Sequence, residues 1–525
     1  MESPRWLLGP NERGNEKTVL VDRRDEAWSA DNQVRALIHG DTYFAELLRR
    51  IEAMESGDLV LFTDWRGDPD ERLGGPGTEV AEVFARAVAR GVVVKGLIWR
   101  SHLDRLNFSA TENRHLGEEV NKAGGECIRD MRCRPGGSHH QKLVVLRHAN
   151  RPELDVAFAG GIDLCHTRHD NAEHRGDPQA QPMSKAYGER PPWHDIQLEI
   201  RGPAVGDLEA GFRERWEDPR PVTRNPFYRL SDMLHQNDDD KPDPIPEQLP
   251  DPEPVGRHTV QVLRTYPPHG YPFAPDGERS IARAYRKVIG NARRIIYVED
   301  QYFWSSEVVH AFAKALRAQP ELRLIAVIPH HPEQDGWVAM APALVGRCDA
   351  MALLSDAAPD RFAIYGVENH EGTPVYVHAK VGIIDDVWAS VGSDNVNRRS
   401  WTHDSELACA VLDEDLDGRE PYAGEARRFA RELRLELARE HLDREPGDDA
   451  DLLDPAGAFD AFRASADALQ QWHDGGQVGD RPPGRLRPYR LDPLNLRTRL
   501  WARPLNRLLV DPDGRPWRMR RRQDF

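Results

Sequence analysis

The sequence contains the same order of elements twice, and this duplication limits the folds open to the chain. Four apolar runs have the length of buried strands, at residues 59–62, 92–99, 295–298 and 324–329. A segment with apolar residues at helical spacing separates the two runs of each pair. Strand, helix and strand in this order predict a right-handed crossover, so we expect two largely parallel sheets.

A histidine and a lysine two residues apart also occur twice. His140 and Lys142 precede an apolar run, and His378 and Lys380 repeat the arrangement 238 residues later. Side chains at positions i and i+2 of an extended strand share a face, so each pair is expected to point into one site. An imidazole can attack or donate a proton, and an ammonium group beside it can hold an anion. The pattern therefore predicts phosphoryl chemistry.

Each pair is followed by a glycine-rich turn, at residues 160–163 and 392–395. The second copy, with His378, Lys380, Asp385 and the turn at their particular spacing, resembles the motif of the phospholipase D superfamily. A second copy at the duplicated offset strengthens this resemblance. The first copy departs from the family pattern, because Arg147 stands where the family usually has an aspartate.

Flanking segments resemble the larger, eukaryotic-type phospholipases D. They are Gly160-Gly161-Ile162-Asp163-Leu164-Cys165, Pro192-Trp193-His194-Asp195 and Glu299-Asp300-Gln301-Tyr302-Phe303. The resemblance implies an α/β fold of two α/β/α sandwich halves, related by a pseudo-twofold axis, with the active site at their interface. We expect an N-terminal half over residues 1–235, an exposed acidic, proline-rich linker over 236–256, a C-terminal half over 257–445 and an extension over 446–525.

The resemblance also implies residue roles. His140 is the expected nucleophile and His378 the general acid and base, while Lys142 and Lys380 neutralise the phosphate. A carboxylate from the opposite half is expected behind each histidine. The expected catalytic carboxylates are Glu406 for His140 and Asp195 for His378, and the expected substrate-binding residues are Asn395, Ser393, Asp163 and Asp385.

The implied reaction is phosphodiester cleavage through a covalent phosphohistidine. Its expected substrate is a phospholipid, hydrolysed to phosphatidic acid and a free headgroup, with transfer to an alcohol as a variant. We expect no metal and no other cofactor, because the histidines are too dispersed in the sequence for a typical zinc site. A nuclease, a lipid-binding scaffold that has lost catalysis with the Arg147 change, and a lipid synthase remain alternatives.

Composition narrows these alternatives. The formal net charge of −16 argues against a nucleic-acid partner. No apolar run approaches the roughly 20 residues that span a bilayer, and the N-terminus has no signal-peptide core. Five cysteines without close metal-type spacing indicate free thiols. We therefore expect a monomeric, cytoplasmic protein.

Two C-terminal segments carry many arginines. Residues 424–444 alternate arginine and glutamate with leucines, which predicts a surface helix. Residues 485–522 mix arginines with leucines and tryptophans. This tail either folds back over the core or contacts anionic lipid headgroups at a membrane surface.

Overall fold

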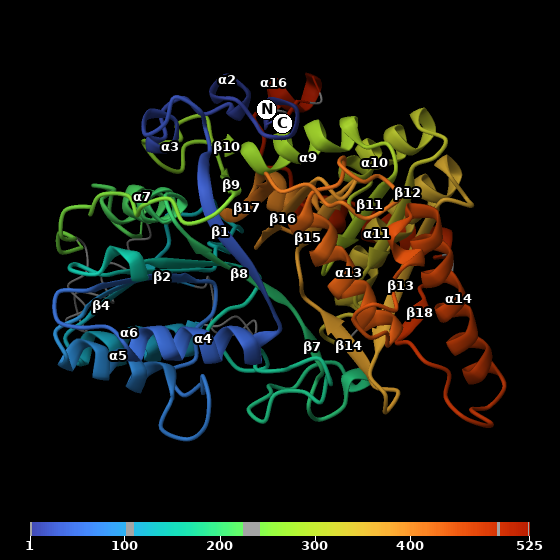
Figure 1. Cartoon of the computed structure of the whole chain (residues 1–525), viewed down its shortest axis with the longest axis horizontal. Coiled ribbons are helices and arrows are strands. Elements are labelled where there is room, and N and C mark those ends of the chain that lie inside the picture. The colour runs from blue at the N-terminus through green and yellow to red at the C-terminus, as the bar shows by residue number, and fades with distance from the viewer. Residues whose placement is uncertain (1–2, 101–109, 224–241, 336, 491–493, 523) are drawn as a thin grey trace.

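The computed structural model describes residues 3–100, 110–223, 242–335, 337–490, 494–522 and 524–525. Its first half contains a mixed sheet (Figure 1), in which seven of the described strands pair. Neighbouring strands follow the order β1 (Ser29–Ile38), β8 (Ile196–Arg201), β6 (Val156–Gly160), β5 (Leu143–Arg147), β2 (Leu59–Asp64), β3 (Val93–Trp99) and β4 (Glu126–Asp130).

The second half repeats this sheet. Its strands follow the order β9 (His258–Tyr266), β17 (Glu406–Asp413), β16 (Trp388–Gly392), β15 (Val381–Ile384), β11 (Ile295–Glu299), β12 (Arg323–Val327) and β13 (Phe362–Glu368). In each sheet only the last three strands run parallel, and the other neighbours are antiparallel. The prediction of largely parallel sheets is therefore wrong: the crossover units are parallel, but the strands that follow the histidine–lysine segments return as hairpins.

Helices cover the outer face of each sheet. The first sheet packs against α4 (Gly40–Glu52), α5 (Val80–Ala89) and α6 (Ala110–Lys122), and the second against α9 (Ser280–Asn291), α10 (Ser306–Ala318) and α11 (Trp337–Ala357). The inner faces of both sheets share one apolar core with α7 (Ala204–Trp216), α13 (Arg428–Leu442) and α14 (Pro455–Asp474). This shared core confirms two α/β/α halves that meet along a common face.

Helix α13 is buried, although its sequence predicts a surface helix. Arg431 and Arg434 are each 1% exposed, and both guanidinium groups bond to Asp386. Asp386 lies in the turn between β15 and β16. A carboxylate from a distant turn therefore supplies the charge that lets an arginine-rich helix enter the core, and the pattern within the helix cannot reveal it.

Arg147 has a structural role at the end of β5. Its buried guanidinium pairs with Asp155 at 2.8 Å and with Glu209 of α7. It also donates to the carbonyl oxygen of Pro250 at 2.6 Å. Residues 242–256 of the expected linker thus run along α7 as a tethered extended segment, held also by Arg213, which donates to Pro246 O. Residues 236–241 lie outside the described residues.

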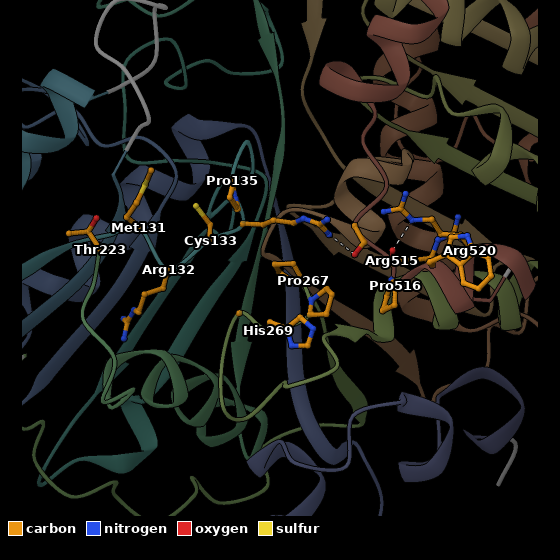
Figure 2. Close-up of a pocket in the computed structure, with 15 residues that line it drawn as sticks. Met131, Arg132, Cys133, Pro135, Thr223, Pro267, His269, Arg515, Pro516 and Arg520 are labelled. Atoms are coloured by element: carbon orange, nitrogen blue, oxygen red, sulfur yellow. Dashed lines mark hydrogen bonds between the residues drawn. The ribbon is translucent and has the colours of Figure 1, made fainter. Parts of the chain in front are cut away.

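The C-terminal tail folds back over both halves, which confirms the first of the two interpretations. It contributes β18 (Leu486–Pro488), which pairs with β13, then α15 (Leu496–Leu505), a π-helical turn η5 (Asn506–Val510) and α16 (Trp517–Arg522). Arg134 of the first half donates to Gly514 O at 2.7 Å. Figure 2 shows the pocket beside this contact, which is lined by Pro135 of the first half and by Arg515 and Pro516 of the tail. None of the described helices is long and apolar enough to cross a bilayer.

We expect Arg147→Met to destabilise the protein by about 3–5 kcal/mol, because it leaves Asp155 and Glu209 buried without their common partner. Arg147→Asp, which restores the residue type that the family usually has, should destabilise it at least as much by adding a third carboxylate. Urea unfolding followed by fluorescence measures the effect. Arg463→Met, at an exposed pair with Asp460, is the control and should leave the midpoint unchanged. An unaltered midpoint in Arg147→Met would show that this network does not stabilise the fold.

Candidate active site

Backbone pairing between the halves brings each histidine to the carboxylate of the other half. His140 N donates to Ser405 O at 2.8 Å, directly before Glu406. His378 N donates to His194 O at 2.8 Å, directly before Asp195. The second contact extends the parallel pairing of β14 (Pro374–Val377) with β7 (Trp193–His194). The same local geometry therefore occurs twice. In one case the first half supplies the histidine and the second half the carboxylate, and in the other case these contributions are reversed.

Both expected histidine–carboxylate contacts are present. His140 Nδ1 lies 2.9 Å from Glu406 Oε2, and His378 Nδ1 lies 2.6 Å from Asp195 Oδ2. A carboxylate that accepts the Nδ1 proton fixes the tautomer of an imidazole and leaves Nε2 for chemistry. Both histidines line one cleft of about 750 Å³.

The histidine–lysine segments are extended but lie outside the regular strands. β5 begins at Leu143 and β15 at Val381, each directly after the lysine. The backbone before each lysine bonds to the opposite half rather than to its own sheet, which explains why the predicted strands start later. Lys142 Nζ donates to His140 O at 2.9 Å, and Lys380 Nζ donates to His378 O.

The electrostatics of the cleft favour an anion. Burial lowers the pKa of Lys380 to about 8, although Asp195 opposes this shift. Burial, and then the positive charges of Lys380 and Arg168, hold the pKa of His378 well below its usual value. Burial raises the pKa of Asp195, and Lys380 counters part of the rise. A phosphate group would relieve the crowding of positive charge around His378.

Of the four expected substrate-binding residues, only Asn395 lines the cleft. Ser393 Oγ donates to Glu406 Oε2 at 2.6 Å, so it positions that carboxylate. Asp163 lies 3.4 Å from Lys142 Nζ and accepts the Trp65 backbone N–H at 3.0 Å.

Asp385 does not reach the cleft. Its carboxylate accepts the backbone N–H groups of Arg293, Arg294 and Ile295 at 2.8–3.0 Å. The residue lies at the end of β15 away from Lys380, and it fixes the start of β11. Its position supports a structural role, so the expectation that it contacts substrate is corrected.

Sequence reasoning missed most of the cleft wall. The lining is rich in aromatic and charged side chains, among them Trp65, Trp99, Trp304, Arg168 and Arg399, and it also includes Trp193 and Tyr302. The rings form stacked pairs, with Trp65 on Trp99 at 5.7 Å and Tyr302 on Trp304 at 4.0 Å between centroids. The Arg168 guanidinium lies 3.9 Å from the centroid of the Trp193 ring. Trp193 and Tyr302 belong to segments that carried the family resemblance, whereas Trp65 and Trp99 had no such signal.

The two copies of the site differ in what supports the carboxylate. Ser393 of the second copy corresponds to Gly161 in the first. A side chain cannot fit at Gly161, because a Cβ there would lie 2.1 Å from Asp195 Oδ1. Glu406 thus accepts a hydroxyl proton besides the His140 imidazole, while Asp195 accepts the Ile196 backbone N–H at 2.9 Å.

The protein thus contains two copies of one sheet, and the two copies meet at a single cleft. Each copy supplies the carboxylate that lies beside the histidine of the other copy. Two family models match it, "Phospholipase D" over residues 109–242 and "Cardiolipin synthase, PLD-like domain" over residues 285–419. Each match contains one histidine–lysine segment. The chain belongs to the phospholipase D superfamily, near its eukaryotic branch.

Named relatives agree with this assignment. Phospholipase D alpha 1 of Zea mays is 26% identical over 490 residues, which cover 70% of this chain and 59% of the relative. Phospholipase D1 of Schizosaccharomyces pombe is 27% identical, with 58% of this chain and 27% of the relative covered. The chain therefore spans only part of these relatives. The crystal structure of a Haemophilus influenzae phosphatidylserine synthase has the same fold, with a TM-score of 0.55 at 13% identity over 86% of this chain and 96% of that chain.

We expect the His378 imidazole of the free protein to titrate well below the ordinary value of about 6.5. Lys380→Met should raise its pKa, because the substitution removes a buried positive charge beside the ring. NMR of protein with 13C-labelled histidine, assigned with His378→Asn, measures both values. The exposed Lys314→Met is the control and should change neither. A wild-type resonance that titrates near 6.5 would contradict the electrostatic account.

Proposed function

We propose that this protein cleaves phospholipids at the headgroup phosphodiester through a covalent phosphohistidine. The products are phosphatidic acid and a free headgroup, or a phosphatidyl alcohol when an alcohol replaces water. The observation that carries the proposal is the pair of histidines facing one cleft, each backed by a carboxylate from the other half. The phospholipase D relatives, which this chain covers in part, support the same reaction class.

In the proposed first step His140 Nε2 attacks phosphorus while Glu406 holds the Nδ1 proton. The P–O bond to the headgroup breaks, and His378 protonates the departing oxygen. In the second step neutral His378 takes a proton from water or an alcohol, which displaces His140 from phosphorus. Lys142 and Lys380 neutralise the phosphoryl oxygens in both steps.

The low pKa of His378 agrees with this cycle. A general acid must carry a proton when the substrate is bound, and the anionic phosphodiester raises the pKa of a neighbouring imidazole. The same histidine returns to its neutral form when the phosphate charge leaves, which suits the role of base. A single residue can thus perform both roles because the substrate itself carries the charge that shifts its pKa.

The cleft wall supports a lipid substrate over a nucleic acid. Its two arginines, Arg168 and Arg399, are offset by Glu333, Asp404 and Glu406. A groove for single-stranded nucleic acid needs a continuous basic track, and this lining has mixed charge. Leu509 and Val510 of the tail add apolar groups to the same wall.

The tail beside the cleft supports contact with a membrane surface. Leu500, Leu508 and Leu509 are 69%, 71% and 66% exposed on α15 and η5. Exposed arginines, including Arg497 and Arg507, accompany these leucines. Apolar groups that enter the interface and arginines that pair with anionic headgroups are the composition of a peripheral membrane segment.

Purified protein incubated with phosphatidylcholine vesicles and butanol should form choline and phosphatidylbutanol. His140→Asn and His378→Asn should each reduce the rate by about 10²–10⁴-fold, because each removes a group that reacts in the transition state. His473→Gln, at an imidazole paired with Glu368 away from the cleft, is the control and should retain full activity. Products are quantified by mass spectrometry.

Two further experiments distinguish the proposed reaction from a silent scaffold and from a nuclease. Slow His378→Asn turnover should leave a phosphatidyl adduct on the peptide that contains His140, which a silent scaffold cannot form. Single-stranded DNA offered in parallel should stay intact. DNA cleavage without any lipid product would overturn the proposal.

We expect Leu500→Asp with Leu508→Asp to lower activity on anionic vesicles by at least about tenfold, because the charged side chains oppose insertion into the interface. Activity on a short-chain phospholipid below its critical micelle concentration should be unchanged. Val478→Asp, at a residue 82% exposed outside the tail's α15 and η5, is the matched control. Equal losses on vesicles and on the monomeric lipid would argue for damage to the cleft rather than to membrane contact.

A further inference from the structure

Behind Asp195, four side chains from distant parts of the chain converge at the boundary between the halves. They are His39 before α4, His174 in the loop before β7, His194 in β7 and Glu440 in α13. Their side chains are at most 10% exposed. None of these residues takes part in the proposed reaction, and the dispersed sequence positions gave no sign that they meet.

Three ring nitrogens surround one carboxylate in this cluster. His39 Nε2 lies 2.8 Å from Glu440 Oε2, while His174 Nε2 and His194 Nδ1 lie 3.0 and 3.2 Å from Oε1. One ligand atom from each of the four residues lies within 4.8 Å of all the others. Ligand atoms around a tetrahedral zinc ion with bonds of about 2.0–2.1 Å are roughly 3.3 Å apart. The cluster is therefore close to the size of a zinc site.

Hydrogen bonds alone explain the cluster poorly. His174 Nδ1 faces the carbonyl oxygen of Trp193 at 3.1 Å, and a carbonyl can only accept, so this nitrogen carries a proton. In the neutral ring His174 Nε2 therefore holds a lone pair, and it lies 3.0 Å from Glu440 Oε1, which cannot donate to it as a carboxylate. His194 faces Glu440 with Nδ1 and Glu299 with Nε2.

The His174 and His194 rings lie 5.6 Å apart between centroids, and Glu440 contacts both of them while Glu299 contacts His194. A divalent cation at the centre of the cluster would accept the lone pairs of neutral His39 Nε2, His174 Nε2 and His194 Nδ1 beside the Glu440 carboxylate.

Two of the three histidines, His174 and His194, have the outer contacts of metal-bound histidines, whereas His39 Nδ1 has no hydrogen-bond partner among the described residues. A histidine ligand usually donates its other ring N–H to a carboxylate or a backbone carbonyl, which fixes the ring orientation. His194 Nε2 lies 2.7 Å from Glu299 Oε2, and His174 Nδ1 faces Trp193 O. Glu299 in turn accepts from Tyr297 Oη at 2.5 Å, so the carboxylate is itself held in place.

Backbone strain at the cluster is an independent sign of function. His39 has φ 68° and ψ 159°, a conformation that is essentially restricted to glycine. His174 also has a positive φ of 53°. Strained residues persist where the surroundings fix them, and such residues gather at binding sites. Here two of the four converging side chains come from strained positions.

We propose that His39, His174, His194 and Glu440 bind one structural zinc ion that joins the two halves behind the active cleft. Three imidazoles and one carboxylate form a closed tetrahedral set that suits zinc. The ion would hold β7, whose His194 precedes Asp195 directly and whose backbone carbonyl accepts from His378 N. The inference concerns a metal site outside the cleft, and it goes beyond the proposed reaction.

Metal analysis of the full-length wild-type chain, purified without chelators or a histidine tag, tests the proposal. We expect about one zinc per chain by inductively coupled plasma mass spectrometry. Removal with dipicolinate should lower the thermal midpoint, and added zinc should restore it. Cobalt loaded in place of zinc should give the intense visible bands of a tetrahedral site. None of these readouts uses a substrate, so a failed lipid assay leaves them informative.

Variants locate the site. His174→Gln and Glu440→Gln should each reduce bound zinc at least tenfold, because each removes one ligand. His473→Gln is the matched control, since His473 Nε2 pairs with Glu368 at 3.0 Å outside the cluster and should keep the full complement. If a ligand variant does not fold, the cobalt spectrum of the wild-type protein still tests whether a tetrahedral metal site is present. Wild-type protein that contains no zinc and takes up neither zinc nor cobalt would overturn the proposal, as would full zinc retention in both ligand variants.

Discussion

The site depends on backbone hydrogen bonds that cross between the two halves. His140 N bonds to Ser405 O, and His378 N bonds to His194 O. The residue directly after each acceptor carries the carboxylate that lies beside the histidine of the opposite half. Neither half contains a complete histidine–carboxylate pair. The shared apolar core between the inner faces of the sheets holds this arrangement, because it fixes the distance between the two exchanged segments.

Charge is the second constraint. Lys380 and His378 are almost completely buried, and burial weakens the charged form of both. The positive charge of Lys142 is balanced by the carboxylate of Asp163 at 3.4 Å, and both residues belong to the first copy. At the turn position that corresponds to Asp163 the second copy has neutral Asn395. The positive charge that remains is therefore concentrated near His378, where a phosphate can neutralise it.

Local patterns in the sequence predicted the helices and buried strands well, because apolar periodicity reports which face of an element meets the core. The strand predicted over 59–62 is the buried β2, and the helical segment predicted between it and the run at 92–99 contains α5. Features set by distant partners were not predictable. Nothing within α13 indicates that Asp386 neutralises Arg434, so its burial was missed. The motif residues and their crosswise contacts followed from the family resemblance. The aromatic wall and the histidine cluster depend on folding, because their members are adjacent only in space.

The differences between the two copies follow from what surrounds each one. Arg147 and Asp385 occupy corresponding positions at the ends of β5 and β15 away from the cleft. Neither side chain contacts a site histidine, so the arginine can be matched by Asp155 and Glu209 without affecting them. Inside the cleft the difference has a chemical consequence. Ser393 gives the carboxylate behind His140 a second hydrogen-bond donor, whereas Gly161 only makes room for the carboxylate behind His378. The two histidines therefore lie in unlike surroundings, which suits the proposed division into one nucleophile and one acid.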